Sequence, residues 1–546
     1  MADRASKAIL AKGIRLDRNY RNIINYSESN MVNLVTSKAI SSFNNCSFIR
    51  DMKNVVELEV AYGTALQADY IAFQNPDYSN KWFFAFIDKI EYRSEKNTRI
   101  YFTVDVCSTW YDYWTPQKCW VLREHANTDV AGDNLVPENL ELGEFITNGA
   151  RVDITNNTAY RYCVITTAKP NDSNKYVYSN LCGVIVSGLL VVFKDPAQFA
   201  NFILELSNDG KLDAVSQAYI VPFGCLNWDN DLTYHDDLGA TDEKIYYTYN
   251  GSSNPYQEDK NIVRPTSLNG YTPVNKKLLT APFQSIVMSN NAGSVNNYAY
   301  EYFSNPNACK FRTRYMPVVG ASIISYPCDY KGVTYNLNEA LVGAKFPALQ
   351  WTGDVYTNWL TQNAVNIGIG IVSDGIGLVN SSLQFSNALE SDNASEMSRG
   401  FSSSGSGVID AGLSVASQLA EIRKHSLVPM SIRGSSNTGD VLTGMKELGT
   451  YAYRMSITRD FAERIDQYFT RYGYATNKLK YPNQTGRATF NYIQIGAGEN
   501  IGYTSNTISV PPESMEIINN VYRAGVTVWH SHDNIGNFDL ANGIVS

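Results

Sequence analysis

The sequence lacks the short motifs that mark many catalytic sites. It contains no Walker phosphate-binding loop, no GxSxG nucleophile turn, no HExxH pair and no Cys/His cluster of the zinc-binding kind. These absences favour a non-enzymatic role without cofactors. Carboxylate pairs for glycoside cleavage need no local motif, so Asp236 with Asp237, or Glu141 with Glu144, are only arbitrary candidates.

Closely spaced cysteines and a signal peptide are also missing. The eight cysteines stand singly with no CxxC pair, which predicts reduced and mostly buried thiols rather than disulfides. Residues 1–20 begin with charges and lack a continuous apolar segment, so we expect the chain to fold in a cytoplasm. The cysteines are Cys46, Cys107, Cys119, Cys163, Cys182, Cys225, Cys309 and Cys328.

Positive charge is in deficit, with 45 Lys and Arg against 53 Asp and Glu and a formal net charge of −8. DNA affinity comes mainly from Lys and Arg that neutralise phosphates, which argues against tight nucleic-acid binding. A slightly acidic wall would instead repel a duplex and let it slide. The charge balance is therefore compatible with transient passage of DNA.

Long runs of strong helix formers are scarce, whereas Tyr (37), Phe (22) and Gly (37) are common. This composition predicts a mainly β protein of antiparallel sheets in barrel-like or sandwich domains, with a few helices. With 546 residues, 44% of them hydrophobic, the chain should bury a sizeable core and divide into three or four domains. Fixed-period repeats and coiled-coil heptads are absent, which argues against a fibrous trimer.

Alternating hydrophobic residues predict a β-hairpin formed by residues 82–93 and 99–106, with a turn at 94–98. Further strands are expected at 161–167, 182–193 and 218–223, separated by turn-forming residues. One face of the first hairpin strand would carry Phe84, Phe86, Ile90 and Tyr92, and one face of the second Ile100, Phe102, Val104 and Val106.

One helix is predicted late in the chain. Hydrophobic residues recur at helical spacing from Ile457 to Tyr472, and Gly473 follows where a C-terminal cap is expected. The charged residues of this segment would face solvent or a neighbouring subunit. They are Arg459, Asp460, Glu463, Arg464 and Asp466.

The most unusual feature is an apolar, polar, apolar insertion at about residues 364–437. Its two glycine-rich apolar runs, 364–380 and 407–420, are each shorter than the roughly 20 residues of a transmembrane helix. Small residues would let several such segments pack closely in lipid, so a membrane-active loop makes most sense in an oligomer. Core pieces joined by a flexible linker are the alternative. The candidate membrane-active residues are Ile367, Gly368, Ile369, Gly370, Ile371, Val372, Ile376, Gly377, Leu378, Val379, Val408, Ile409, Leu413, Val415 and Leu419.

Two polar groups are candidate sites. His530 and His532 with Asp533 could place two imidazoles on one side of a strand, but no third metal ligand is identifiable. A polar hairpin tip is the preferred interpretation of this group. Arg123, Glu124 and His125 form a compact charged trio, interpreted as an intersubunit or loop-anchoring hydrogen-bond network.

Several segments, in this order, resemble the tail knob or distal tail tube proteins of small short-tailed bacteriophages of the Picovirinae type. They are FAFIDKIEY with RIYFTVDVCSTWYDYW, VLREH with the acidic loop ending GEF, GYTPVNKKLLTAPF, FPALQWTGDVYTNWLTQN, the insertion, DQYFTRYGYATNKLKYPN and GVTVWHSHDNIGNFD.

The resemblance implies a homohexameric tube whose hydrophobic loops plug its distal end. On host contact the loops would line a pore in the cytoplasmic membrane, through which the viral double-stranded DNA passes. Other tail proteins would be its partners in the virion. We accordingly expect an N-terminal β tube domain at 1–145, middle β structure at 146–345, a distal segment with the insertion at 346–480, and a C-terminal β segment returning to the tube at 481–546.

Two other functions stay open from sequence. A receptor-binding or glycan-degrading tail spike is the main alternative, and a pore-forming toxin is a third class that normally carries a secretion signal.

Asp374 and Asp410 lie inside the apolar runs, where a carboxylate is costly in lipid. They suggest a pore-facing position, a loop that only plugs the tube, or an insertion assisted by acid.

Overall fold

The computed structural model describes residues 6–48, 54–76, 79–155, 160–211, 214–222, 226, 230–239, 241–251, 256–315, 317–318, 322–345, 348–351, 432–434, 449–504 and 508–545. The chain forms two compact units. Unit 1 comprises Met1–Glu144, Gly270–Thr280 and Ile457–Ser546, and unit 2 comprises Phe145–Asn269 and Ala281–Ser456. Residues 481–546 thus share unit 1 with the N-terminal segment, while the four-domain division stays a prediction.

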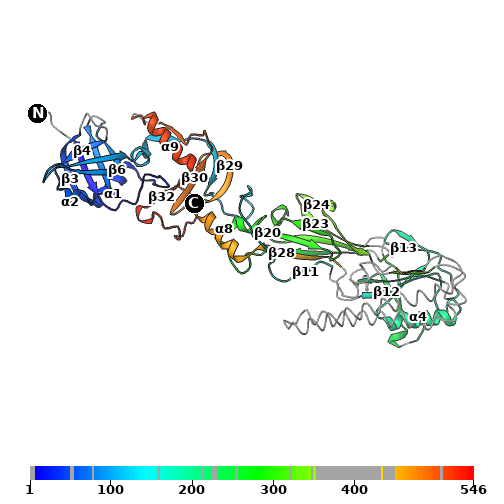
Figure 1. The fold of residues 1–546 in the computed structure, drawn as a ribbon. Coiled ribbons are helices and arrows are strands. Elements are labelled where there is room, and N and C mark those ends of the chain that lie inside the picture. The colour runs from blue at the N-terminus through cyan, green and yellow to red at the C-terminus, as the bar shows by residue number, and fades with distance from the viewer. Residues whose placement is uncertain are drawn as a thin grey trace, which may run out of the picture. The chain divides into compact units, whose positions relative to one another are not determined.

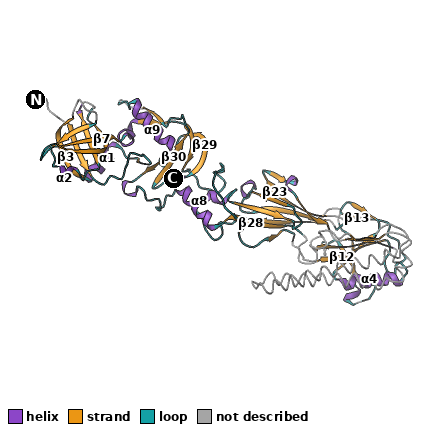
Figure 2. Ribbon diagram, in the orientation of Figure 1, coloured by secondary structure: helices purple, strands orange, loops and turns teal. Residues whose placement is uncertain are grey.

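Strands in antiparallel sheets dominate the described residues, and helices are few (Figure 2). The predicted mainly β class is confirmed. In unit 1, the N-terminal strands, blue in Figure 1, close into a barrel. Its strand order is β1 (Ser6–Ala11), β3 (Ala39–Phe48), β4 (Val55–Leu58), β7 (Thr98–Val104), β6 (Lys81–Tyr92) and β5 (Tyr70–Asn75).

The predicted hairpin is β6 and β7, and the face assignments in it are wrong for Ile90 and for Val106. Val106 lies beyond β7, in α3 (Val106–Trp110), and belongs to another core cluster, with Cys107, Trp110 and Ile493. Phe84 and Phe86 join the cluster that also contains Phe490 and Trp529, whereas Ile90 packs with Ala85, Ile100 and Phe102. The pairing register shifts between Ile87 and Lys89. One extra residue in a strand reverses the alternation beyond it, which moves Ile90 to the opposite face from Phe84.

A second sheet of unit 1 joins strands from both ends of the chain. Its order is β2 (Asn22–Ile24), β32 (Val526–Trp529), β30 (Phe490–Ile495), β9 (Cys119–Glu124) and β29 (Tyr474–Lys480). Strand β2 pairs with β32 in parallel, and β29 pairs with β9 antiparallel. A small ribbon pairs β8 (Trp114–Pro116) with β31 (Gly502–Thr504). The α-helices among the described residues of unit 1 are α1 (Glu28–Ser37), α2 (Tyr62–Ala65), α3 (Val106–Trp110), α8 (Arg459–Tyr472) and α9 (Pro512–Ala524).

The late helix predicted from sequence is α8, and its cap is confirmed. Gly473 follows it at φ +63°, and the Gly473 N–H donates to the Phe469 carbonyl at 2.8 Å. Ile465 and Phe469 are buried as the helical spacing predicts. Strand β29 begins at the next residue, so this glycine turns the chain from the helix into the sheet.

Among its described residues, unit 2 contains three larger sheets and a hairpin. The first runs β10 (Phe145–Thr147), β28 (Tyr451–Ile457), β20 (Gln284–Ser289) and β21 (Val295–Tyr298), with β11 (Val152–Asp153) also on β28. The second runs β17 (Leu232–His235), β18 (Tyr246–Tyr249), β15 (Leu189–Phe193), β12 (Tyr160–Thr166), β16 (Val215–Pro222), β26 (Ala348–Trp351) and β27 (Ile432–Gly434).

The third sheet runs β19 (Tyr256–Ile262), β22 (Cys309–Tyr315), β23 (Ser322–Tyr330) and β24 (Val333–Tyr335), with β25 (Leu341–Lys345) also paired to β23. Helix α4 (Pro196–Asn208) packs on the second sheet, and β13 (Ser179–Leu181) pairs with β14 (Val184–Val186). The expected strand at 182–193 is therefore divided between β14 and β15.

The described cysteines are free and buried, as the sequence predicts for reduced thiols. They are Cys46, Cys107, Cys119, Cys163, Cys182, Cys309 and Cys328. Burial raises the pKa of Cys46 and of Cys119 to about 11, which keeps both protonated at neutral pH. Cys225 lies outside the described residues.

Candidate functional site

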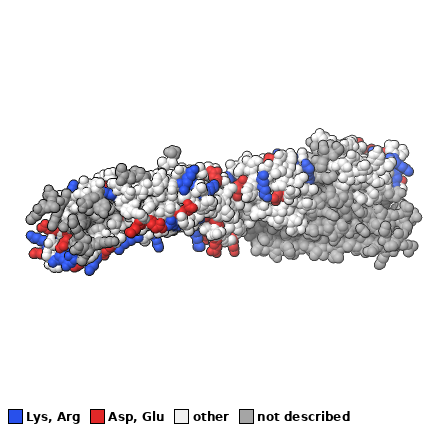
Figure 3. Space-filling model, turned by 90° about the horizontal axis from the view of Figure 1, so that it is seen from above, with Lys and Arg blue, Asp and Glu red and all other residues white. Residues whose placement is uncertain are grey.

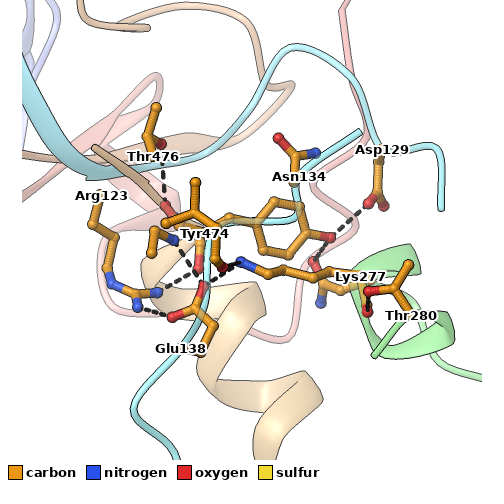
Figure 4. Close-up of polar contacts among 12 residues, drawn as sticks. Arg123, Asp129, Asn134, Glu138, Lys277, Thr280, Tyr474 and Thr476 are labelled. Atoms are coloured by element: carbon orange, nitrogen blue, oxygen red, sulfur yellow. Dashed lines mark hydrogen bonds and ion pairs between the residues drawn. The ribbon is translucent and has the colours of Figure 1, made fainter. Parts of the chain in front are cut away.

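Three segments of unit 1 that are distant in sequence meet around buried polar side chains. Loop 125–144 follows β9, Gly270–Thr280 forms the second segment, and α8 with β29 forms the third. Figure 4 shows Arg123 and Lys277 pointing toward Glu138 of the loop, and Tyr474 pointing toward Asp129. We call these residues and their direct partners the fastening network.

Glu138 is the centre of the fastening network, with a side chain only 1% exposed. Its Oε1 accepts from the Lys277 ammonium at 2.6 Å and from the Ala475 N–H at 2.8 Å, and its Oε2 accepts from Arg123. Burial lowers the pKa of Lys277, and the ion pair with Glu138 opposes that shift. Both carboxylate oxygens are thus engaged by donors from the chain itself.

Lys277 and Tyr474 hold the loop at two further points. The Lys277 ammonium also donates to the Val136 carbonyl at 2.7 Å. The Tyr474 hydroxyl donates to Asp129 at 2.5 Å, and the Lys276 N–H donates to the same carboxylate at 3.1 Å. Burial and the neighbouring Asp129 charge both raise the pKa of Tyr474, so the phenol remains a donor.

Asp466 of α8 fastens the second segment, which corrects the prediction that it faces solvent. Its carboxylate accepts from the Tyr271 hydroxyl at 2.7 Å and from the Val274 and Asn275 N–H groups at 2.7 and 2.9 Å. Asp466 is 2% exposed. Its partners lie almost 200 residues earlier in the chain, so the charge pattern of the helix alone could not identify them.

The predicted trio of Arg123, Glu124 and His125 does anchor loops. Besides Glu138, Arg123 donates to the Gly473 carbonyl at 2.8 Å. Glu124 pairs with Lys480 and accepts from the Asn483 N–H at 2.8 Å. The loop-anchoring interpretation is confirmed, and its intersubunit form stays a prediction.

His125 is held as one neutral tautomer. Its Nδ1 accepts from the Tyr492 N–H at 2.7 Å, and its Nε2 lies 3.0 Å from the Thr470 carbonyl, to which only a protonated nitrogen can donate. Burial, and secondarily the Arg487 charge, lower the pKa of His125 to about 3. The imidazole therefore remains neutral wherever the fold is intact above that pH.

The histidine pair near the C-terminus does not converge on one point. His532 is 3% exposed and its Nε2 accepts from the Arg15 N–H at 3.1 Å, whereas His530 Nε2 lies 3.3 Å from the Gln484 carbonyl. Within the described ranges, no group of three or more His, Cys, Asp or Glu is placed to hold a metal ion. The predicted polar hairpin tip is wrong for His532, which is part of the core.

The carboxylates of the two arbitrary pairs are exposed, and one of them accepts a hydrogen bond. Asp237 accepts from the Tyr246 hydroxyl at 2.9 Å, and Asp236, Glu141 and Glu144 are exposed.

The fifteen candidate membrane-active residues, from Ile367 to Leu419, lie outside the described residues, as do Asp374 and Asp410. Among the helices in the part of the chain that the structure describes, none is long and apolar enough to cross a membrane.

Sequence reasoning selected the right segments but missed most members of the fastening network. Glu138, Asp129, Lys277 and Tyr474 were not singled out. One available signal was the position of Lys277, which stands directly before Leu278 and Leu279. Both leucines are buried, and a solvated lysine is unusual in such a position.

The described polar network of this β-rich chain holds its own loops together, which is the arrangement expected of a structural protein. Comparison with known proteins gives the family. Residues 246–543 match the model of the C-terminal domain of the tail knob protein gp9 of Bacillus phage phi29, and residues 4–115 match that of the caudoviral major tail protein N-terminus. The chain belongs to the phi29 gp9 tail knob family.

Individual relatives agree over almost the whole length. The tail knob proteins gp9 of Bacillus phages PZA and phi29 are each 23% identical to this chain, with 94% of both chains covered in each case. The solved tail knob protein gp12 of bacteriophage C1 is similar with a TM-score of 0.63 and 13% identity, over 99% of this chain and 100% of that one. These relatives are named as tail knob proteins and not as enzymes. The chain is a structural component of a phage tail, where it associates with other tail proteins.

Proposed function

We propose that the chain forms a homohexameric tube at the distal end of the tail and conducts viral DNA during genome ejection. In this proposal, the insertion predicted at about residues 364–437, up to the start of β27 at Ile432, plugs the tube and then inserts in the host cytoplasmic membrane to form the pore. Membership of the tail knob family supports the tail location. The apolar runs inside a largely polar chain support the membrane step.

The observation that carries the proposal is the pairing of β26 with β27. Leu349, Gln350 and Trp351 pair with Gly434, Arg433 and Ile432, so residues 352–431 leave the sheet and return to it at the same place. An insertion with adjacent ends can change its surroundings without a change in the strand order of its sheet. This topology suits a segment that moves from the lumen of the tube into a membrane.

The hydrophobic effect also favours a segment that can bury its apolar side chains first against symmetry mates and then against lipid. Apolar side chains such as Ile367, Ile371 and Leu378 gain roughly 25 cal/mol per Å² when removed from water, whether against symmetry mates or against lipid. The hydrophobic effect is non-directional, so it does not require one geometry. Neither run reaches the roughly 20 residues that a spanning helix needs, which favours cooperation between copies.

Dye leakage from vesicles tests the membrane step. A variant that lacks residues 364–425 keeps β26 and β27, and a second variant replaces Ile367, Ile369 and Ile371 with Ser. We expect both to assemble as the parent does but to release no dye. The matched control changes Ser402, Ser403 and Ser404 of the polar spacer to Ala and should retain leakage. Unchanged leakage by the deletion variant would contradict the membrane role.

The two carboxylates of the insertion allow a test of acid assistance. Leakage by the parent chain at pH 5 should exceed that at pH 7.5, because protonation lowers the cost of placing Asp374 and Asp410 in lipid. The double change Asp374→Asn with Asp410→Asn should remove this dependence. Leakage that does not vary with pH would show that the carboxylates face water throughout.

A further inference from the structure

One edge of the second sheet of unit 1 has an exposed apolar surface. Strand β29 is the last strand in the sheet order, so beyond Ala475 its outer backbone edge pairs with no strand of the described residues. Trp120 and Leu479 are direct cross-strand partners and are 45% and 62% exposed, and Tyr481 is 58% exposed. Gly496 lies beside Trp120 and contributes no side chain to cover it. We call Lys118, Trp120, Lys478, Leu479 and Tyr481 the edge patch.

The second half of loop 125–144 is an extended arm with one face free. From Asp133 to Gly143 the residues alternate strictly between exposed and half-buried. The inward face is held by Glu138 and by the bond from Lys277 to the Val136 carbonyl. No strand in the described part of the chain pairs with residues 134–144, although their period of two is that of a strand. Leu135, 40% exposed, is on the outward face.

The edge patch and the exposed charged residues of the arm have opposite charge. Lys118 and Lys478 are exposed, and Lys118 lies 5.7 Å from the centre of the Tyr481 ring. Asp133, Glu141 and Glu144 are exposed on the arm, and none of these five residues forms an ion pair with another described residue. Glu499, whose carboxylate accepts from the Trp120 N–H at 3.2 Å, reduces the positive charge of the edge patch but does not cancel it.

On the face drawn in Figure 3, acidic and basic side chains are interspersed over the described surface. The charges of this face therefore favour local pairing over one extended field of a single sign. We propose that the arm, residues 133–144, of one copy docks along the edge patch of a second copy of this chain. The arm adds a strand to the free edge of β29, and its carboxylates meet Lys118 and Lys478 of the partner.

Two different surfaces of one chain make this contact head to tail. Such a heterologous contact generates a ring where the rotation closes, unlike a twofold contact that stops at a dimer. Strand addition provides backbone hydrogen bonds, and exposed Trp and Tyr provide the kind of anchor that dominates interface energies. The inference rests on the proposed oligomeric tube and names the surfaces that build it.

Charge reversal on each side separately provides the test. The first variant carries Lys118→Glu with Lys478→Glu, and the second carries Glu141→Lys with Glu144→Lys. Each is expected to raise the concentration at which half of the chain assembles by at least tenfold, measured by native mass at several concentrations. A control with Lys12→Glu and Lys96→Glu, both exposed on unit 1, has the charge change of the first variant and should assemble as the parent does.

Mixing distinguishes complementary docking from simple damage. In an equimolar mixture, every contact between the two variants again joins opposite charges, so even-numbered assemblies should form. The quadruple variant, which carries both sets of changes, should also assemble alone. Two results would overturn the docking and leave the tube proposal intact. One is assembly of either double variant at the same concentration as the parent, and the other is an equimolar mixture that stays unassembled. A parent chain that never assembles overturns the tube itself.

Discussion

At the scale of single residues, stability in unit 1 is expected to depend on charges that are buried together. Glu138 neutralises both Lys277 and Arg123, whose side chains are 3% and 14% exposed. Removal of one partner from a buried ionic group leaves the other charges uncompensated, at a cost of about 3 to 5 kcal/mol. Glu138→Ala should therefore lower the free energy of unfolding by about this amount in urea titrations.

The double variant Glu138→Gln with Lys277→Met is the matched control for this prediction. It removes the central pair together and leaves only Arg123, which has the Gly473 carbonyl as a second partner. It should lose clearly less stability than Glu138→Ala. Equal losses in the two variants would show that packing, and not the uncompensated charge, sets the cost.

The lowered pKa of buried His125 predicts a loss of folding stability in acid. Its pKa is about 3 in the fold against an ordinary value of 6.5, so below pH 6.5 the unfolded chain binds the proton that the folded chain excludes. The stability from neutral burial is fully present above pH 6.5. As the pH falls toward 3 it decreases by about 1.4 kcal/mol per unit.

The variant His125→Gln isolates the histidine from other titrating groups. The Gln amide can accept from the Tyr492 N–H and donate to the Thr470 carbonyl without taking up a proton. Between pH 7.5 and 4, the urea midpoint of the parent should fall by more than the urea midpoint of the variant. Parallel curves would mean that His125 does not contribute to the acid response.

At the scale of elements, Gly473 connects α8 to β29 in a conformation reserved for glycine, at φ +63° and ψ −152°. A Cβ there would also clash with the Glu124 carbonyl of the neighbouring strand. Gly473→Ala should destabilise the fold by about 2 kcal/mol or more in urea titrations. Gly498→Ala, at φ +85° with no heavy atom within 4 Å, is the control and should cost about 1 kcal/mol. Similar midpoints for the two variants would contradict the role of the close approach.

The same elements show how far sequence patterns determine structure. Local signals located α8, its glycine cap and the β6–β7 hairpin, because helical spacing and strand alternation are properties of neighbouring residues. The face of Ile90 was wrong because a register shift depends on the partner strand. Asp466 was wrong because its partners, Tyr271 and Asn275, come from a distant loop. Contacts of this kind depend on the whole fold.

At the scale of the whole molecule, the chain crosses between its two units four times, after residues 144, 269, 280 and 456. The short segment Gly270–Thr280 belongs to unit 1 although it is flanked on both sides by unit 2. The fastening network acts on this segment through Asp466, Lys276 and Lys277. Its role is therefore to fix the course of the chain, as a structural tail component requires.

The native mass of the purified chain, with negative-stain images of the same sample, tests the central claim most directly. The account predicts a ring or short tube with a central hole and a mass of about 365 kDa, six times that of the 60.9 kDa chain. A heterologous contact gives a closed ring where its rotation closes, whereas spikes with extended β structure are usually trimeric rods. A trimeric rod, or a chain that remains monomeric at all concentrations, would contradict the account.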